Sequence, residues 1–261
     1  MAIFICMALS DKIINSFYLQ DELNPDVWYL PKGEDKNNTS NYRVKPEIRE
    51  RLLKIGDIFI DYIDTDLFIH DIIFVGSLVG YNWSEFSDFD VHIVVDISEA
   101  GDNKDLYEEL FRLKKSIFNA AHNIIIKGYE VELYVEDINE GNESQGVYSL
   151  VNNEWIKTPK KQEFKIDKVK LKSKIQQWVD IIDDVLKDAK DKNLEGALKL
   201  VKKYRDKLRK YRTCGLKKEG EYSYENLVFK YLRRNGYISK LEDFKNEFVD
   251  KKLSLKEQFF K

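Results

Sequence analysis

The pattern of apolar and polar residues changes near residue 160. Before that point, segments with helical spacing and segments typical of strands follow one another, and after it the spacing is helical throughout. After Pro46, apolar residues recur at helical spacing in "EIRERLLKIGDIFIDYI", which predicts a helix. The runs "FIHDIIFVG" and "DFDVHIVVD" and the alternating stretch "YEVELYVED" predict three strands. A further helix is predicted between the last two strands, in "KDLYEELFRLKKSIFNAAHNIII". This order predicts an α/β (α+β) domain with a mixed sheet.

The second part of the chain is predicted to be helical throughout. The patterns "KVKLKSKIQQWVDIIDDVLKDAK" and "LEGALKLVKKYRDKLRKYRT" predict two long amphipathic helices, and two or three shorter helices follow. The stripe of the first helix comprises Val169, Ile175, Trp178, Ile181, Ile182 and Val185. "GVYSLVNNEWIKTPKK", which precedes these helices, is interpreted as a turn-rich connector.

Three parts are therefore expected along the chain. Residues 1–45, rich in Pro, Asn, Asp and Gly, form an irregular N-terminal arm whose Trp28, Tyr29 and Leu30 pack back onto the body. Residues 46–160 form the α/β domain, and residues 161–261 form the α-helical C-terminal domain.

Composition and cysteine usage narrow the class of protein. The chain has 261 residues, 43% of them hydrophobic, so it can bury a sizeable core. No apolar run approaches the roughly 20 residues that span a bilayer, so no membrane association is expected. Cys6 and Cys214 lie far apart and outside any CxxC motif, which argues against a disulfide framework or a zinc site. We expect a cytoplasmic protein, in the host cytoplasm if a phage encodes it.

The net charge of -3 conceals a local excess of basic residues. Residues 160–218 contain 20 Lys and Arg against 9 Asp and Glu, and ten basic residues stand with one acid between Lys199 and Lys218. A helix from Lys199 to Arg212 could therefore follow the phosphates of RNA. An ordinary solvated helix explains the same charge equally well.

Asp88 and Asp90 are the clearest candidates for chemistry. Alternate residues of a strand point to one face about 6 to 7 Å apart, so the two carboxylates can share a cation. Oxygen ligands favour Mg²⁺, with Mn²⁺ as an alternative. Glu132 in "VELYV" is the expected third ligand, while Glu130 and Glu136 share its face nearer the strand ends.

A Gly76-Ser77 pair stands twelve residues before Asp88, directly after a predicted strand. Glycine lets a backbone approach a phosphate closely, and the serine hydroxyl can bind the phosphate oxygens. Together with the carboxylates, this pair implies a nucleoside triphosphate (NTP). Ser87 could bind the nucleotide or only cap the turn, and Lys230 in "SYENLVFKYLRR" could face the triphosphate or solvent.

"VGSLVGYNWSEFSDFDVHI" resembles the GS-x(10)-DxD signature of the DNA polymerase β-like nucleotidyltransferase superfamily. That superfamily includes aminoglycoside nucleotidyltransferases, poly(A) and CCA-adding enzymes, and cyclic oligonucleotide synthases. The resemblance covers about residues 45 to 140 and implies a palm-like domain. It matches Gly76 and Ser77 to the phosphate-binding pair, and Asp88, Asp90 and Glu132 to the catalytic metal ligands. The segments "LNPDVW" and "GEYSYENLVFKYLRRNGYI" also resemble predicted nucleotidyltransferases of large tailed bacteriophages.

The chain departs from many such relatives because the loop "LVGYNWSEF" contains no basic residue. Triphosphate charge must then be met elsewhere. His92 could touch substrate or be a half-buried histidine satisfied within the protein, and Tyr81, Asn82 and Trp83 could contact a base or merely cover the loop. The His70-Asp71 pair faintly resembles a metal phosphohydrolase dyad, but the further ligands of such a site are missing, and we interpret it as a strand-edge pair.

The predicted function is magnesium-dependent transfer of a nucleoside monophosphate from an NTP to a hydroxyl acceptor. The helical domain is expected to close a cleft over Ser77, Asp88, Asp90 and Glu132. An RNA 3′ end is slightly favoured as acceptor, while protein hydroxyls, small molecules and a second nucleotide stay open. One alternative is a non-catalytic nucleotide- or partner-binding module, which the missing arginine favours and the complete carboxylate set disfavours. Another is a cyclic or oligonucleotide synthase.

Overall fold

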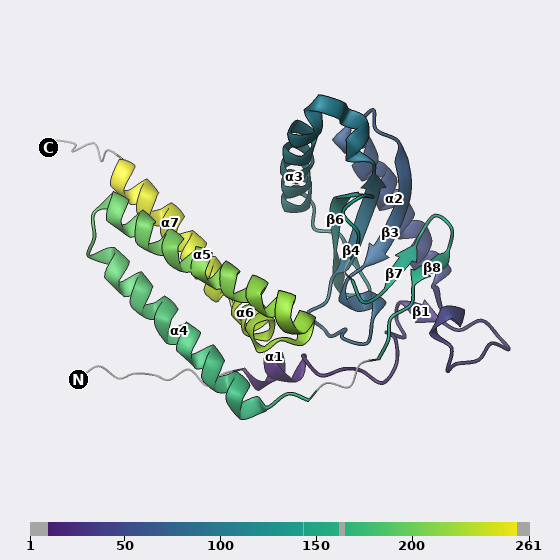
Figure 1. Cartoon of the computed structure of the whole chain (residues 1–261), viewed down its shortest axis with the longest axis horizontal. Coiled ribbons are helices and arrows are strands. Elements are labelled where there is room, and N and C mark those ends of the chain that lie inside the picture. Colours follow the sequence, from purple (N-terminus) through teal and green to yellow (C-terminus); the bar gives the residue numbers. More distant parts are fainter. Residues whose placement is uncertain (1–9, 143, 162–164, 255–261) are drawn as a thin grey trace, which may run out of the picture. The chain divides into compact units, whose positions relative to one another are not determined.

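A computed structural model describes residues 10–142, 144–161 and 165–254 of the chain (Figure 1). Two compact units are present: residues 18–163 form the sheet unit, and residues 1–17 together with 164–261 form the helical unit. The arm expected over residues 1–45 is thus shared between the units, with the break after Phe17.

The sheet unit contains a six-stranded mixed sheet in the order β5-β6-β4-β3-β7-β8. At its centre, β3 (Ile69–Val75) pairs antiparallel with β4 (Phe89–Val95), and β4 pairs parallel with β6 (Tyr129–Asp137). The short β5 (Ile125–Ile126) borders only the start of β6. These bounds confirm the three predicted strands and the mixed sheet.

Helices α2 (Pro46–Ile63) and α3 (Lys104–Ala121) pack against one face of this sheet. Pro46 stands at the first turn of α2, where its fixed φ suits the helix and its missing N–H is no loss. The odd-numbered residues of β4, such as Phe89, Val91 and Ile93, are fully buried against the helices. The even-numbered residues of β4 therefore project from the opposite face, which carries the candidate site.

The connector expected to be turn-rich contributes two strands instead, β7 (Val147–Ser149) and β8 (Glu154–Lys157). β7 pairs with β3, and β8 extends the sheet beyond it. Tyr148 is fully buried, and its ring meets Trp155 edge-on with centroids 5.1 Å apart. Strands this short leave too few residues for an alternating pattern, so the prediction of a plain connector was wrong.

The N-terminal arm adds β1 (Trp28–Tyr29) and β2 (Arg43–Val44), which pair antiparallel, and the 3₁₀ turn η1 (Thr39–Asn41). Trp28 is only 3% exposed and stacks on Trp155 with ring centroids 4.5 Å apart, so it packs onto the body as expected. Tyr29 does not, because its side chain points from the other face of the two-residue strand and is 36% exposed.

The helical unit consists of α1 (Asp11–Asn15), α4 (Lys168–Lys190), α5 (Leu194–Glu219), α6 (Tyr224–Arg234) and α7 (Tyr237–Leu253). Three further 3₁₀ turns are η2 (Ser77–Val79) and η3 (Ile97–Asn103) in the sheet unit and η4 (Gly220–Tyr222) before α6 of the helical unit. The predicted long helices and the shorter ones after them are confirmed. Of the stripe predicted for α4, Ile175, Trp178, Ile182 and Val185 are buried, Ile181 is partly buried, and Val169 is 80% exposed, so its assignment to the stripe was wrong.

Within the described parts of the chain, no helix has the length and apolar character needed to cross a membrane. Cys214 is exposed and carries a free thiol, whereas Cys6 lies outside the described residues.

Candidate metal and nucleotide site

Three carboxylates meet where β4 begins beside β6. Asp88 directly precedes β4, Asp90 is its second residue, and Asp90 stands opposite Glu132 in the parallel register. One carboxylate oxygen from each of the three residues lies within 4.8 Å of the others. The predicted convergence is thus present, and the three residues can together hold a metal ion.

The strands hold these carboxylates rigidly because the residues between them are anchored in the core. Phe89, Val91 and Leu133 are fully buried on the helix-covered face. Asp88 and Asp90 are half-buried, whereas Glu132 is exposed. The site is therefore fixed at its base and open on the side of Glu132.

Gly76 follows β3 and lies against Asp90. Its φ of 83° and ψ of -165° belong to a region that only glycine occupies readily. A Cβ atom at this position would lie 1.9 Å from Asp90 Oδ2. Glycine is thus required both for the turn and for the position of the Asp90 carboxylate.

Ser77 opens the 3₁₀ turn η2 (Ser77–Val79) that follows Gly76. Its hydroxyl donates to Ser87 Oγ at 2.7 Å, and the same Ser87 oxygen accepts the Ser84 N–H at 3.0 Å. Ser87 is only 7% exposed. Ser87 therefore fixes Ser77 relative to the loop before Asp88, and direct contact between Ser87 and a nucleotide stays a prediction.

The loop over residues 80–87 is held by the N-terminal arm, a contact that sequence reasoning missed. Trp83 Nε1 donates to the Glu22 carbonyl at 2.9 Å, and the Tyr81 hydroxyl lies 3.0 Å from Thr39 Oγ1. The backbone of Gln20 also donates to the Tyr81 carbonyl at 2.7 Å. These contacts favour the interpretation that Tyr81 and Trp83 cover the loop.

His92 lies two residues beyond Asp90 on the same face of β4. Its Nδ1 atom is 2.5 Å from Glu136 Oε2, and Glu136 also accepts hydrogen bonds from Asn142 Nδ2 at 2.9 and 3.1 Å. The His92 and Glu136 side chains are 18% and 15% exposed. This pattern favours a half-buried histidine satisfied within the protein. On β3, the Asp71 carboxylate accepts the Ser149 hydroxyl at 2.9 Å, as a structural strand residue would.

Lys230 belongs to the helical unit, on α6. Its ammonium group lies 3.9 Å from Glu221 Oε2, and its side chain is 25% exposed. Burial lowers the pKa of Lys230; Glu221 opposes that shift, while Arg234, Arg233 and Arg212 reinforce it. Lys230 therefore lies close enough to three arginines and one carboxylate for each to affect its charge, and the positive charges outnumber the negative one.

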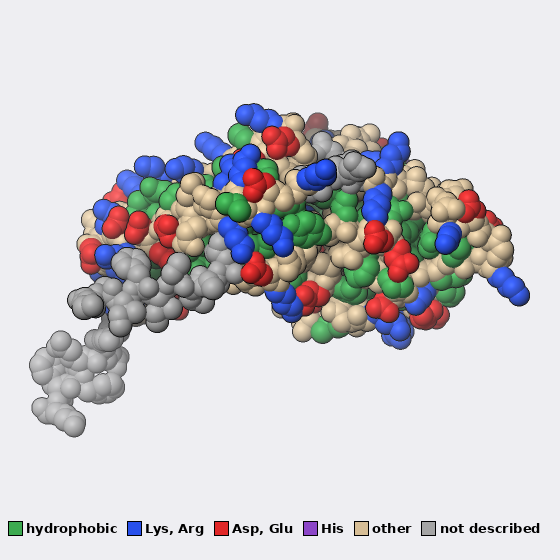
Figure 2. All heavy atoms as spheres, turned by 90° about the horizontal axis from the view of Figure 1, so that it is seen from below, with side chains coloured by type: hydrophobic (Ala, Val, Ile, Leu, Met, Phe, Trp, Pro, Cys, Tyr) green, Lys and Arg blue, Asp and Glu red, His purple; other side chains and the backbone are tan. Residues whose placement is uncertain are grey.

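The basic residues predicted from Lys199 to Arg212 all lie on one helix, α5. Part of their charge is neutralised within the unit: Lys199 Nζ is 2.6 Å from Glu195 Oε1, and Arg205 pairs with Glu242. Lys203, Lys207 and Arg209 extend the basic character of this helix. On the face drawn in Figure 2, Lys and Arg side chains are interspersed with Asp and Glu.

Comparison of this chain with protein-family models, with curated proteins and with solved structures gave no match.

Proposed function

We propose that the chain is a magnesium-dependent nucleotidyltransferase that moves a nucleoside monophosphate from an NTP to a hydroxyl acceptor. The observation that carries this proposal is the Asp88–Asp90–Glu132 cluster, with oxygens within 4.8 Å, set beside a glycine that leaves no room for a side chain. The three carboxylates repel one another on the uncovered face of the sheet, at the start of β4 and on β6. This repulsion favours binding of a cation over a structural role.

The donor set fits Mg²⁺, and Mn²⁺ as a substitute, because all three side chains offer only oxygen. Bound there, the metal would neutralise phosphate charge and orient the α-phosphate for attack. The loop before Asp88 contains no basic residue, so contact between Lys230 and the triphosphate stays a prediction from the sequence.

In this reaction the acceptor oxygen forms a bond to the α-phosphorus. The bond from that phosphorus to the oxygen bridging to the β-phosphate breaks, and pyrophosphate leaves. Glu132 is the most exposed of the three carboxylates and takes the proton of the acceptor hydroxyl. Ser77 binds a phosphate oxygen by turning its single hydroxyl proton from Ser87 Oγ to the phosphate when the nucleotide binds.

An RNA 3′ end is the slightly favoured acceptor, supported by the cations of α5. A basic helix of this length can contact several successive phosphates, and such contacts dominate nucleic-acid affinity.

The test is pyrophosphate release from each of ATP, GTP, CTP and UTP with Mg²⁺, with and without RNA. Activity should disappear in Glu132→Gln and persist in Glu130→Gln, a matched control because Glu130 is an exposed carboxylate two residues earlier on β6. NTP binding that is indifferent to Mg²⁺, without turnover, would contradict the proposal and favour a non-catalytic module. Oligonucleotide products formed from NTPs alone would instead indicate a synthase.

A further inference from the structure

Helix α3 carries an apolar stripe that does not take part in the core of the sheet unit. The stripe, which we call the α3 seam, comprises Leu106, Leu110, Leu113 and Ile117. Leu106, Leu113 and Ile117 are 63%, 51% and 58% exposed, and Leu110 is half-buried. Single exposed apolar residues are common on proteins, whereas a continuous apolar row marks an interaction surface.

The core contacts of α3 come from a different face of the helix. Phe111 and Phe118 are each only 4% exposed and belong to the core of the sheet unit. Phe111 is five residues beyond Leu106, and Phe118 is five residues beyond Leu113. At 3.6 residues per turn, each phenylalanine lies about 140° around the helix from the seam. The seam is therefore not needed to hold α3 on the sheet.

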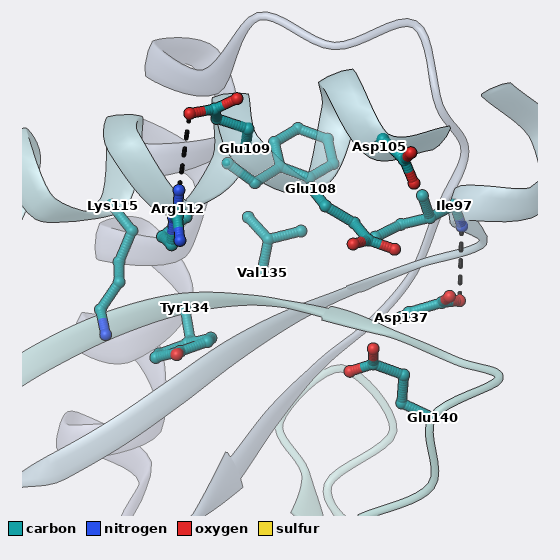
Figure 3. Close-up of a pocket in the computed structure, with 11 residues that line it drawn as sticks. Ile97, Asp105, Glu108, Glu109, Arg112, Lys115, Tyr134, Val135, Asp137 and Glu140 are labelled. Atoms are coloured by element: carbon teal, nitrogen blue, oxygen red, sulfur yellow. Dashed lines mark hydrogen bonds and ion pairs between the residues drawn. The ribbon is translucent and has the colours of Figure 1, made fainter. Parts of the chain in front are cut away.

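A third face of α3 is charged, and it borders a hollow between α3 and the end of β6 (Figure 3). Arg112 on this face has its Nη2 atom 3.5 Å from Glu109 Oε1. The residues of α3 that line the hollow, apart from Phe111, are Asp105, Glu108, Glu109, Arg112 and Lys115. The seam itself contains no charged residue.

The spacing of the seam fits a partner that is itself a helix. Successive seam residues are four, three and four positions apart, as are the a and d positions of a two-stranded coiled coil. Leu110 and Ile117 take a positions. Leu106 and Leu113 take d positions, and the exposed Ala120 continues this series. The 18 residues of α3 span about 27 Å, which accommodates about two and a half heptads.

The charges beside the seam fit a second copy of α3 that runs in the same direction. Glu109 takes a g position, and Lys114 takes the e position five residues later. In a parallel pair of helices, each g residue faces that e residue of the partner, so Glu109 and Lys114 meet twice by symmetry. In an antiparallel pair, g faces g and e faces e, so these opposite charges do not meet.

Both charged side chains can make this contact and keep the partners they already have. The Glu109 side chain is 62% exposed, although Arg112 borders it. Lys114 Nζ donates to the Tyr62 and Ile63 carbonyls at 3.2 and 2.6 Å. An ammonium group has three N–H donors, so one is left for a carboxylate of the second copy.

We propose that the protein forms a parallel dimer in which the α3 seams of two copies pack against each other. Glu109 of each copy then pairs with Lys114 of the other copy. One short helix from each copy makes a small interface, so monomer and dimer exchange with each other. The inference does not rest on nucleotidyl transfer. The candidate metal site projects from the opposite face of the sheet, so the dimer leaves it open.

Sedimentation velocity on the whole protein tests the seam. The average mass should rise from monomer toward dimer between about 1 and about 200 μM protein. Leu113→Glu should weaken dimerisation by at least about 30-fold, because a charge then enters the seam from both copies. Val169→Glu is the matched control, because Val169 is an exposed apolar residue on α4, and it should dimerise like the parent. A monomer throughout this range, or equal losses in both variants, would overturn the proposal.

A mixing experiment tests the pairing of charges and decides the matter if Leu113→Glu does not fold. Glu109→Lys alone and Lys114→Glu alone should each dimerise about fivefold more weakly, because like charges then face each other. An equimolar mixture of the two variants should recover the parent's dimerisation, since both pairs are again of opposite charge. A folding defect would not be corrected by mixing, so a mixture as weak as its components would refute the pairing.

Cysteine cross-linking tests the direction of the helices. Leu106→Cys, in protein that also carries Cys6→Ser and Cys214→Ser, should form a disulfide with its own copy on mild oxidation. This is expected because equivalent d positions face each other in a parallel pair. Cross-linking of Leu106→Cys to Ile117→Cys, but not to itself, would indicate an antiparallel pair and overturn the proposal.

Discussion

Replacing Gly76 by alanine should change two quantities that can be measured separately. These are the affinity of the site for metal and the stability of the sheet that carries the site. The new Cβ would lie 1.9 Å from Asp90 Oδ2 and 2.9 Å from Asp90 Cγ, where ordinary contact begins at 3.4 Å. The carboxylate must therefore move, although a Mg²⁺ ligand has to stay within a narrow distance of about 2.0 to 2.1 Å from the ion. Loss of a ligand in this way should weaken metal binding by at least about 100-fold.

The same substitution also has a backbone cost. Alanine at φ 83° and ψ -165° is disfavoured by about 1 to 3 kcal/mol. At about 2 to 4 °C per kcal/mol for a unit of this size, Tm should fall by about 2 to 12 °C. Gly128→Ala is the control, because Gly128 has a φ of 86° and, apart from Gly128 and its two chain neighbours, no atom lies within 4 Å of the place that an alanine Cβ would occupy. It should lose stability without disturbing any carboxylate.

Thermal unfolding with and without Mg²⁺ or Mn²⁺ distinguishes the two effects. At a metal concentration of about 100 times Kd, the intact protein and Gly128→Ala should each gain about 2.7 kcal/mol of stability. With a Kd about 100-fold weaker, Gly76→Ala should gain only about 0.4 kcal/mol at the same concentration. Full metal stabilisation of Gly76→Ala would refute the reasoning that this glycine positions Asp90.

Four further outcomes are expected. Asp90→Asn should lower pyrophosphate release by at least about 100-fold. Its unfolding free energy without metal, measured in urea, should be equal or higher because one of three repelling charges is gone. Ser87→Ala should cost about 1 to 3 kcal/mol in the same assay, since the Ser84 N–H loses its acceptor, and an unchanged midpoint would contradict this. Burial raises the pKa of Asp71, so its contribution to stability is greatest below the unfolded pKa and is lost as pH rises through the folded pKa. Asp71→Asn keeps an acceptor for the Ser149 hydroxyl but carries no titrating group. In urea unfolding, its free energy of unfolding relative to the parent protein should therefore rise as pH increases from about 3 to about 7. A difference that does not change with pH would count against this. Lys203→Glu with Arg209→Glu should reduce the salt dependence of RNA binding by a slope of about 1 to 2, and an unchanged slope would remove α5 from the RNA surface.

Local patterns in the sequence determined the main elements and the face that carries the acids. Helix α2 follows from Pro46 and a helical repeat of apolar residues, both of which act within a few residues. At the start of β4, alternation places Asp90 and the preceding Asp88 on the same face because Phe89 and Val91 must be buried. These two predictions can be made without knowing which other segments pack against the helix or the strand.

Glu132 was predicted from the sequence as the partner of the two aspartates, but the tertiary structure decided how the strands align and which other distant residues meet. Asp90 stands opposite Glu132 only because of the register in which β4 and β6 pair. The hydrogen bond from Trp83 to the Glu22 carbonyl joins residues 61 positions apart in the sequence. Val169 is 80% exposed because, at 3.6 residues per turn, it lies on the side of α4 opposite Leu171 and Trp178, so its assignment to the stripe was wrong on local geometry alone. Periodicity fixes the direction of a side chain on its own element, whereas only long-range packing supplies the atoms that surround it.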